Sequence, residues 1–174
     1  MSSGSNPQFT RRLKLDLDRL QKQNPPGVSA RPVKSRHLDK WVARIEGPVD
    51  TPFERGVFNL SMEFPSKYPF KPPKVKFTTP TFHPNVYTDG NIGLDILANE
   101  WVATYDVISV LLSIQALLTD PNPDTAANFE PANLFRQNRQ EYDKRVQDLV
   151  QRNIIGQEKK GEKKLSGFFK RLFH

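Results

Sequence analysis

The 174-residue sequence contains no cysteine. This absence excludes disulfide bonds, thiolate metal sites and any thiol nucleophile from the chain. Long apolar runs are also missing, since none approaches the roughly 18 residues that a helix needs to span a bilayer. The opening residues, MSSGSNPQF, lack the apolar segment of a secretory signal peptide. We therefore expect a soluble protein of the cytoplasm, the nucleus or both.

The composition is that of one globular domain with a basic extension. Hydrophobic residues make up 36% of the chain and include twelve Phe, enough to fill a core. The net charge is +7, but residues 154–174 hold six Lys/Arg against two Glu and so carry +4 of it. The remaining +3, with no pattern of interleaved basic and aromatic residues, argues against nucleic acid as a partner.

The first part of the sequence predicts a helix followed by antiparallel strands. Leucines recur at helical spacing between residues 7 and 23, and Asn24-Pro25-Pro26-Gly27 ends this helix. Short or alternating apolar runs, separated by turn-forming residues, predict strands at 41–45, 57–64 and 75–78.

The second part predicts helices. An apolar stripe from Val107 to Leu118 predicts the central helix, and a pattern from Leu134 to Val150 predicts helical structure that covers the far end of the domain. The composition becomes highly charged from Ile154, so we expect a core domain at 7–153 and a basic linker and tail at 154–174. The whole is an α+β arrangement.

Several separated motifs follow one another along the chain: Tyr68-Pro69-Phe70-Lys71-Pro72-Pro73-Lys74, His83-Pro84-Asn85-Val86-Tyr87, Leu94-Asp95-Ile96-Leu97, Trp101 and Asp120-Pro121-Asn122-Pro123. In order and spacing they resemble the motifs of the ubiquitin-conjugating (E2) enzymes. The resemblance implies the UBC (E2) fold, in which an N-terminal helix precedes a four-stranded antiparallel meander, a central helix and C-terminal helices.

The resemblance also directs attention to Gly93. In this family a cysteine eight residues after the Asn of the His-Pro-Asn motif accepts ubiquitin as a thioester and passes it to a lysine. The residue eight positions after Asn85 is Gly93. Glycine has no side-chain heteroatom that could form an acyl intermediate. The resemblance therefore implies an E2-like chain that cannot form a ubiquitin thioester.

Further catalytic roles follow from the same resemblance. It implies that the amide of Asn85 either stabilises a developing oxyanion or holds the active-site loop. Asp95 and Asp124 lie where the family places acidic residues around the incoming lysine, although loop capping would also explain them. His83 has no second ligand at a usable spacing, so we expect a packed, hydrogen-bonded histidine and no metal. We expect no cofactor.

Three positions resemble binding surfaces of the family. Phe70 resembles the exposed aromatic that E2 enzymes insert into RING or HECT ligases, the alternative being a core Phe. Val102 and Ala103 stand where the family usually has Ser and Pro, which leaves ligase binding through Ala103 open. Ser29 lies near the face on which the family binds a second, noncovalent ubiquitin.

The C-terminal tail carries a stripe of large apolar residues that predicts a docking element. Its members fall at i, i+3, i+4, i+7 and i+8 of a helix, and they are Leu165, Phe168, Phe169, Leu172 and Phe173. Ten residues span only about 15 Å as a helix, too short to cross a bilayer. An anionic membrane surface or a partner groove would fit the stripe, and packing on the chain's own domain is the alternative.

Three hypotheses about function remain open from the sequence. The first is a pseudo-E2 adaptor that binds ubiquitin or a ubiquitin-like protein, an E3 ligase or a catalytic E2. The second is an active E2 ubiquitin transferase whose cysteine has been replaced by Gly93. The third is a scaffold or membrane-recruitment module that uses the fold as a rigid body and docks through the tail, with peripheral membrane association.

Overall fold

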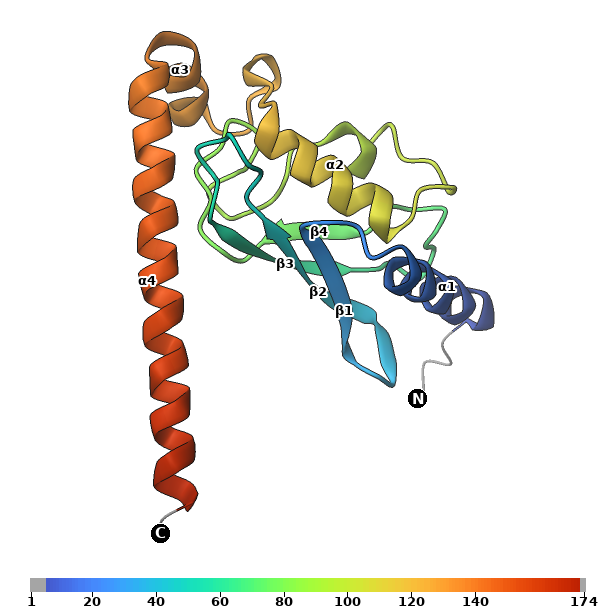
Figure 1. Cartoon of the computed structure of the whole chain (residues 1–174). Helices are drawn as coiled ribbons and strands as arrows, with labels where there is room; N and C mark the ends of the chain where they lie inside the picture. The colour runs from blue at the N-terminus through green and yellow to red at the C-terminus, as the bar shows by residue number, and fades with distance from the viewer. Residues whose placement is uncertain (1–5, 173–174) are drawn as a thin grey trace.

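An antiparallel sheet of four strands forms the middle of the domain (Figure 1). The computed structural model describes residues 6–172. The sheet is a meander in the order β1-β2-β3-β4, with its strands at Val28–Lys34, His37–Glu46, Val57–Glu63 and Lys74–Phe77. Helix α1, at Pro7–Gln23, precedes it and confirms the predicted first helix.

The three predicted strands lie in β2, β3 and β4, while β1 was not recognised from the apolar pattern. Its sequence, VSARPVK, contains a proline and two basic residues, and its pairing with β2 is irregular between Pro32 and Lys34. Alternation is clear in β2, where Trp41, Ala43 and Ile45 are buried and the residues between them are exposed. The meander therefore depends on an edge strand whose own sequence favours loop.

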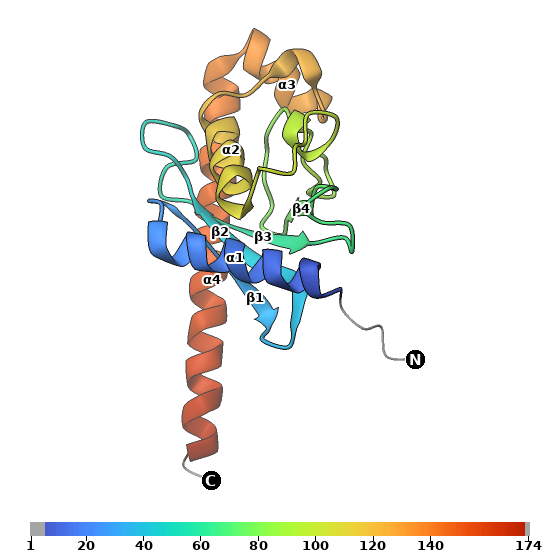
Figure 2. The ribbon, with the colours of Figure 1, turned by 90° about the vertical axis from the view of Figure 1, so that its right-hand side faces the viewer.

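Helix α2, at Val107–Thr119, is the central helix that the apolar stripe predicts. Asp106 caps this helix in a reciprocal pair of hydrogen bonds. Its carboxylate accepts from the backbone N–H of Ser109, and the hydroxyl oxygen of Ser109 accepts from the backbone N–H of Asp106. The helix buries Val110, Leu111 and Ile114 on the same face of the sheet that α1 covers. Figure 2 shows α1 crossing this face, with α4 on the opposite side of the molecule.

The C-terminal part forms two helices, α3 at Phe129–Gln137 and α4 at Arg139–Leu172. The predicted charged linker after Ile154 is helical and continuous with α4. The helix continues because Gln, Glu and Lys are good helix formers and the segment contains no proline, although its three glycines lower helix stability. Figure 1 shows the last turns of α4 projecting beyond the sheet. No helix between residues 6 and 172 has the length and hydrophobicity to cross a membrane.

Candidate active-site loop around Gly93

His83 anchors the start of the loop that leads to Gly93. Its side chain is fully buried, with Nε2 2.8 Å from the Leu117 carbonyl oxygen, and Nδ1 accepts the Asn85 N–H at 2.9 Å. Because Nδ1 accepts, Nε2 carries the proton and donates to Leu117. Burial lowers the pKa of His83 from 6.5 to about 4, although the bond to Leu117 opposes this shift. His83 is therefore a neutral, structural side chain that ties the loop to α2.

Asn85 joins this loop to the segment that follows α2. Its side-chain Nδ2 donates to the carbonyls of Asn122, at 2.8 Å, and Thr125, at 3.1 Å. Its Oδ1 accepts the N–H of Asn122 at 2.8 Å. Both amide hydrogens and the amide oxygen are thus engaged in a buried site. Of the two roles left open by the sequence, this geometry favours holding the loop.

Gly93 lies between the two segments that Asn85 connects. Its N–H donates to the Asn85 carbonyl at 2.8 Å, and Ala127 from the opposing segment donates its N–H to the Pro84 carbonyl at 2.8 Å. A Cβ atom placed on Gly93 would meet the Ala127 Cβ at 3.4 Å and the Asn85 carbonyl oxygen at 3.5 Å. The φ angle of Gly93 lies outside the left-handed region. The backbone at this position therefore accepts a side chain.

Asp95 and Asp124 occupy exposed positions on the two segments beside Gly93. Asp95 begins the 3-10 turn η1 at Asp95–Leu97, where its carbonyl accepts from two backbone N–H groups. Asp124 belongs to η2 at Pro123–Thr125, and its carboxylate pairs with Arg136 of α3. The carboxylate of Asp95 stays exposed two residues from Gly93, whereas that of Asp124 already has a cationic partner.

The Phe70 side chain is 76% exposed, which excludes a core position. It lies on the Pro-rich loop between β3 and β4. The indole N–H of Trp101 donates to the Pro69 carbonyl at 2.8 Å and links this loop to the segment that contains Ala103. Val102 is 46% exposed and Ala103 is half-buried, so each of the two linked loops presents an apolar side chain to solvent.

A buried polar cluster supports these two loops, and the sequence pattern did not reveal it. Asp16 of α1 is buried, pairs with Arg12 at 2.8 Å and accepts from the Tyr68 hydroxyl. Arg12 also donates to the carbonyls of Ala103, at 2.8 Å, and Tyr105, at 2.6 Å. Burial, together with the Asp16 carboxylate, raises the pKa of Tyr68 far above its usual value. The available signal was an acidic residue inside the leucine stripe of α1.

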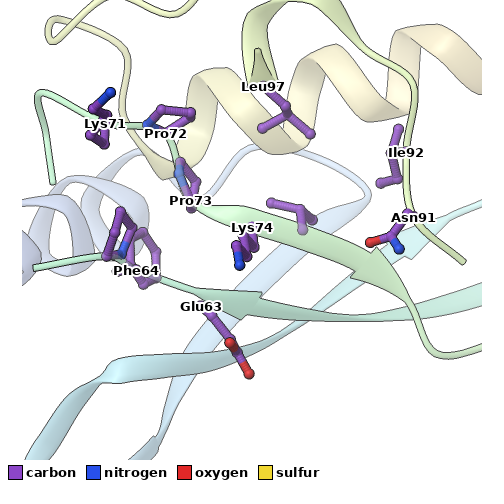
Figure 3. A pocket seen from close by; sticks show the side chains of 11 residues that line it. Glu63, Phe64, Lys71, Pro72, Pro73, Lys74, Asn91, Ile92 and Leu97 are labelled. Atoms are coloured by element: carbon purple, nitrogen blue, oxygen red, sulfur yellow. The ribbon is translucent and has the colours of Figure 1, made fainter. Parts of the chain in front are cut away.

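A pocket of about 550 Å³ separates the Pro-rich loop from the Gly93 loop (Figure 3). Pro72 and Pro73 line it from the first loop, and Ile92 and Leu97 line it from the second. Its charged lining residues, Glu63, Lys71 and Lys74, lie on the side of the Pro-rich loop and strands β3 and β4. Among residues 6–172, no cluster of His, Asp or Glu side chains is arranged to hold a metal ion.

Ser29 is exposed on the outer face of the sheet, the face that α1 and α2 leave uncovered. It pairs with Arg44 of β2 in the strand register. A shallow depression on this face includes Ser29, Arg31, Val42 and Arg44. The face is therefore basic around the predicted binding position.

The apolar stripe of the tail is exposed within the described residues. The exposed fractions are 62% for Leu165, 60% for Phe168, 51% for Phe169 and 60% for Leu172. Phe173, the fifth member of the predicted stripe, lies outside the described residues. In this structure none of the four described members packs on the chain's own domain, which was the alternative to docking.

The amino-acid sequence was compared with protein families and with known proteins. The sequence matches the family model "Ubiquitin-conjugating enzyme" over residues 12–150. It is 53% identical over 145 residues to Ubiquitin-conjugating enzyme E2 1 of Caenorhabditis elegans, covering 83% of this chain and 75% of that protein. It is 53% identical over 143 residues to Ubiquitin-conjugating enzyme E2 2 of Trichoderma harzianum, covering 82% and 94% respectively.

A third relative is Ubiquitin-conjugating enzyme E2 2 of Saccharomyces cerevisiae, 51% identical over 143 residues, with 82% of this chain and 83% of that protein covered. The chain belongs to the ubiquitin-conjugating enzyme (E2) family. Its α+β architecture, with four antiparallel strands between N-terminal and C-terminal helices, is the UBC fold.

Proposed function

We propose that this chain works in the ubiquitin pathway without carrying ubiquitin as a thioester. In this proposal Gly93 stands where the family's active enzymes have their cysteine. The observation that carries it is the combination of a chain with no cysteine and a loop frame around Gly93 that remains hydrogen-bonded and buried. A thioester needs a thiolate, and this chain has none to offer.

The role that fits these features is a pseudo-E2 adaptor. Such a protein would bind ubiquitin or a ubiquitin-like protein, a RING or HECT ligase or a catalytic E2 through surfaces that need no nucleophile. Phe70 supports this role, since an exposed aromatic on a Pro-rich loop that Trp101 holds at Pro69 loses little conformational entropy on binding. The basic outer face around Ser29 offers a second surface.

Incubation with activating enzyme, ubiquitin and ATP tests the missing chemistry. The expected result is no conjugate on a non-reducing gel, with a cysteine-containing E2 charged in parallel as the positive control. A reductant-sensitive band that grows with time would overturn the proposal.

Binding measurements test the adaptor role separately. Titration of labelled protein with ubiquitin, with RING domains and with a catalytic E2 is expected to give saturable binding to at least one of them. Phe70→Ala should weaken ligase binding, and Ser29→Arg should weaken ubiquitin binding, each without affecting the other surface. No binding to any of the three would leave the chain without an adaptor role.

The alternative of an active E2 rests on position 93 alone. A cysteine codon at position 93 of the gene would identify Gly93 as a replacement and the natural protein as a transferase. The adaptor proposal expects a glycine codon there.

The exposed tail supports a second candidate function, recruitment of the domain to another structure. Four large apolar side chains of α4 lie in solvent beyond the domain, although burial of each would stabilise the protein by about 1.5–3 kcal/mol. A chain that ends at Asn153 is expected to keep its fold and lose this recruitment. Equal distribution of the two forms between cell fractions would contradict it.

A further inference from the structure

We propose that the part of α4 beyond Ile154 binds anionic membrane surfaces, and that it bends at Gly156 and Gly161 to do so. This inference rests on the recruitment role proposed above and names its partner as a lipid surface with negative headgroups. The name tail helix is used here for residues 157–172.

The tail helix separates apolar and basic side chains onto opposite sides. At 3.6 residues per turn, its four apolar residues fall within an arc of about 100°. Its basic residues fall within a separate arc of about 140° on the other side. The apolar residues are Leu165, Phe168, Phe169 and Leu172, and the basic ones are Lys159, Lys160, Lys163, Lys164, Lys170 and Arg171. This distribution is typical of helices that lie in a membrane interface.

The tail helix has an excess of basic over acidic residues. Six basic residues face two glutamates, Glu158 and Glu162, both of which precede the apolar residues. None of the ion pairs in the described part of the chain involves the tail helix. Two tail helices that packed through their apolar sides would leave both basic sides facing solvent without an anionic partner, so a second copy satisfies only the apolar side. Anionic lipids satisfy the apolar and the basic side at once.

A straight α4 cannot lie with its apolar side on a flat surface. Phe168 and Leu172 follow Val150 and Ile154 by 18 residues, which is five helical turns. Each pair therefore projects from the same side of the helix. Val150 is buried against the domain and Ile154 packs on the core. A plane that met Phe168 and Leu172 along a straight helix would meet the domain first.

Two glycines lie where a bend would remove this obstruction. Gly156 and Gly161 have open space where a Cβ would be, so neither is needed for close packing. Gln157 donates to the Val57 carbonyl at 3.3 Å, and no later residue of the described α4 hydrogen-bonds to the domain. Glycine lowers helix stability and removes side-chain obstruction to bending. The helix is therefore weakest where it leaves the domain.

Vesicle co-sedimentation of the full-length chain tests the lipid surface. Vesicles of phosphatidylcholine with about one third phosphatidylserine are expected to bind the protein at least tenfold more tightly than phosphatidylcholine alone. Phe168→Ser with Leu172→Ser should weaken binding to the anionic vesicles at least tenfold. The matched control Phe129→Ser, which changes a Phe that is 75% exposed in α3, should bind as the unmodified chain does.

Two further variants test whether α4 bends at Gly156 and Gly161. Gly156→Ala with Gly161→Ala fits the open space, stiffens the helix and is expected to weaken vesicle binding severalfold. Gly167→Ala, which lies within the apolar segment, should leave binding unchanged or strengthen it. If the stiffened variant bound as well as the unmodified chain, the bend would be wrong and the lipid assignment would stand.

Other outcomes overturn the lipid assignment itself. Equal binding to neutral and anionic vesicles, or no loss with Phe168→Ser and Leu172→Ser, would exclude an anionic lipid surface. Light scattering that showed a dimer broken by the same two substitutions would assign the stripe to a second copy instead. The comparison of cell fractions between the full-length chain and a chain that ends at Asn153 tests recruitment without vesicles, so failure of the lipid assignment is distinguishable from failure of the recruitment proposal.

Discussion

The position of a Cβ on Gly93 lies 3.4 Å from the Cβ of Ala127, which is close to an ordinary contact between two carbon atoms. Gly93 is therefore compatible with a side chain directed toward the segment that Asn85 holds in place. The absence of a side chain at this position is a chemical property of the sequence and is not required by the backbone.

Gly93→Cys is expected to fold with a free energy of unfolding within about 1 kcal/mol of the original. It should also form a ubiquitin thioester, because positioning is most of what a protein supplies once a nucleophile exists. A non-reducing gel after incubation with activating enzyme, ubiquitin and ATP measures this. Gly93→Ala is the matched control, with the same Cβ and no sulfur. A folded but uncharged Gly93→Cys would show that the activating-enzyme surface has also been lost.

Asn85→Ala should lower the free energy of unfolding by about 2–4 kcal/mol, since it leaves a backbone N–H and two carbonyls of the opposing segment unpaired. Urea unfolding measures the loss, and hydrogen exchange at the Asn122 amide locates it. Asn91→Ala serves as control, because the Asn91 side chain is exposed and bonds only to Asp89. Unchanged exchange at Asn122 would contradict the loop-holding role.

Asp16→Ala is expected to cost about 3 kcal/mol, because it leaves the Tyr68 hydroxyl buried and the Arg12 guanidinium without its carboxylate. Asp18→Ala breaks an exposed pair with Lys22 and should change stability by no more than about 0.5 kcal/mol. Faster hydrogen exchange at Tyr105 in Asp16→Ala alone would show that the cluster holds the loop. Equal stability of the two variants would refute it.

The free energy of unfolding of the domain should decrease as the pH is lowered, because His83 becomes protonated. Its pKa is lowered from 6.5 to about 4 in the folded chain, so the unfolded chain takes up a proton first as the pH falls. The contribution is complete above pH 6.5 and is lost progressively down to about pH 4, by up to about 3 kcal/mol. Urea midpoints between pH 7.5 and pH 5 measure this slope. His83→Gln should have a shallower slope, and an equal slope would exclude His83 as its source.

Periodicity alone located α1, α2 and three strands, because each carries a regular apolar face. It missed β1, where Pro32 and charged side chains hide an edge strand that only pairing with β2 stabilises. It also merged α3 with the start of α4, since Asn138 separates them without interrupting the apolar spacing. Only the family resemblance supplied the fourth strand.

The sequence identified some residues of the candidate site but not their contacts or their exposure. The motif spacing singled out Gly93 and Asn85, but the partners of the Asn85 amide lie 37 and 40 residues later in the chain and require the fold. The exposure of Phe70 is a tertiary property that a Pro-rich loop suggests without deciding. Asp16 stands out locally as an acidic residue inside the leucine stripe of α1, but its partner Tyr68 lies 52 residues later in the chain and requires the fold.

The bonds of Asn85 give the site a shape that does not depend on position 93. A protein that recognises this shape would meet the same surface whether or not a thiol is present. In a mixture with active relatives, such a chain would occupy shared partners in proportion to its concentration and would never be turned over. Its effect would then follow a titration curve, set by relative abundance and affinity, in place of a catalytic rate.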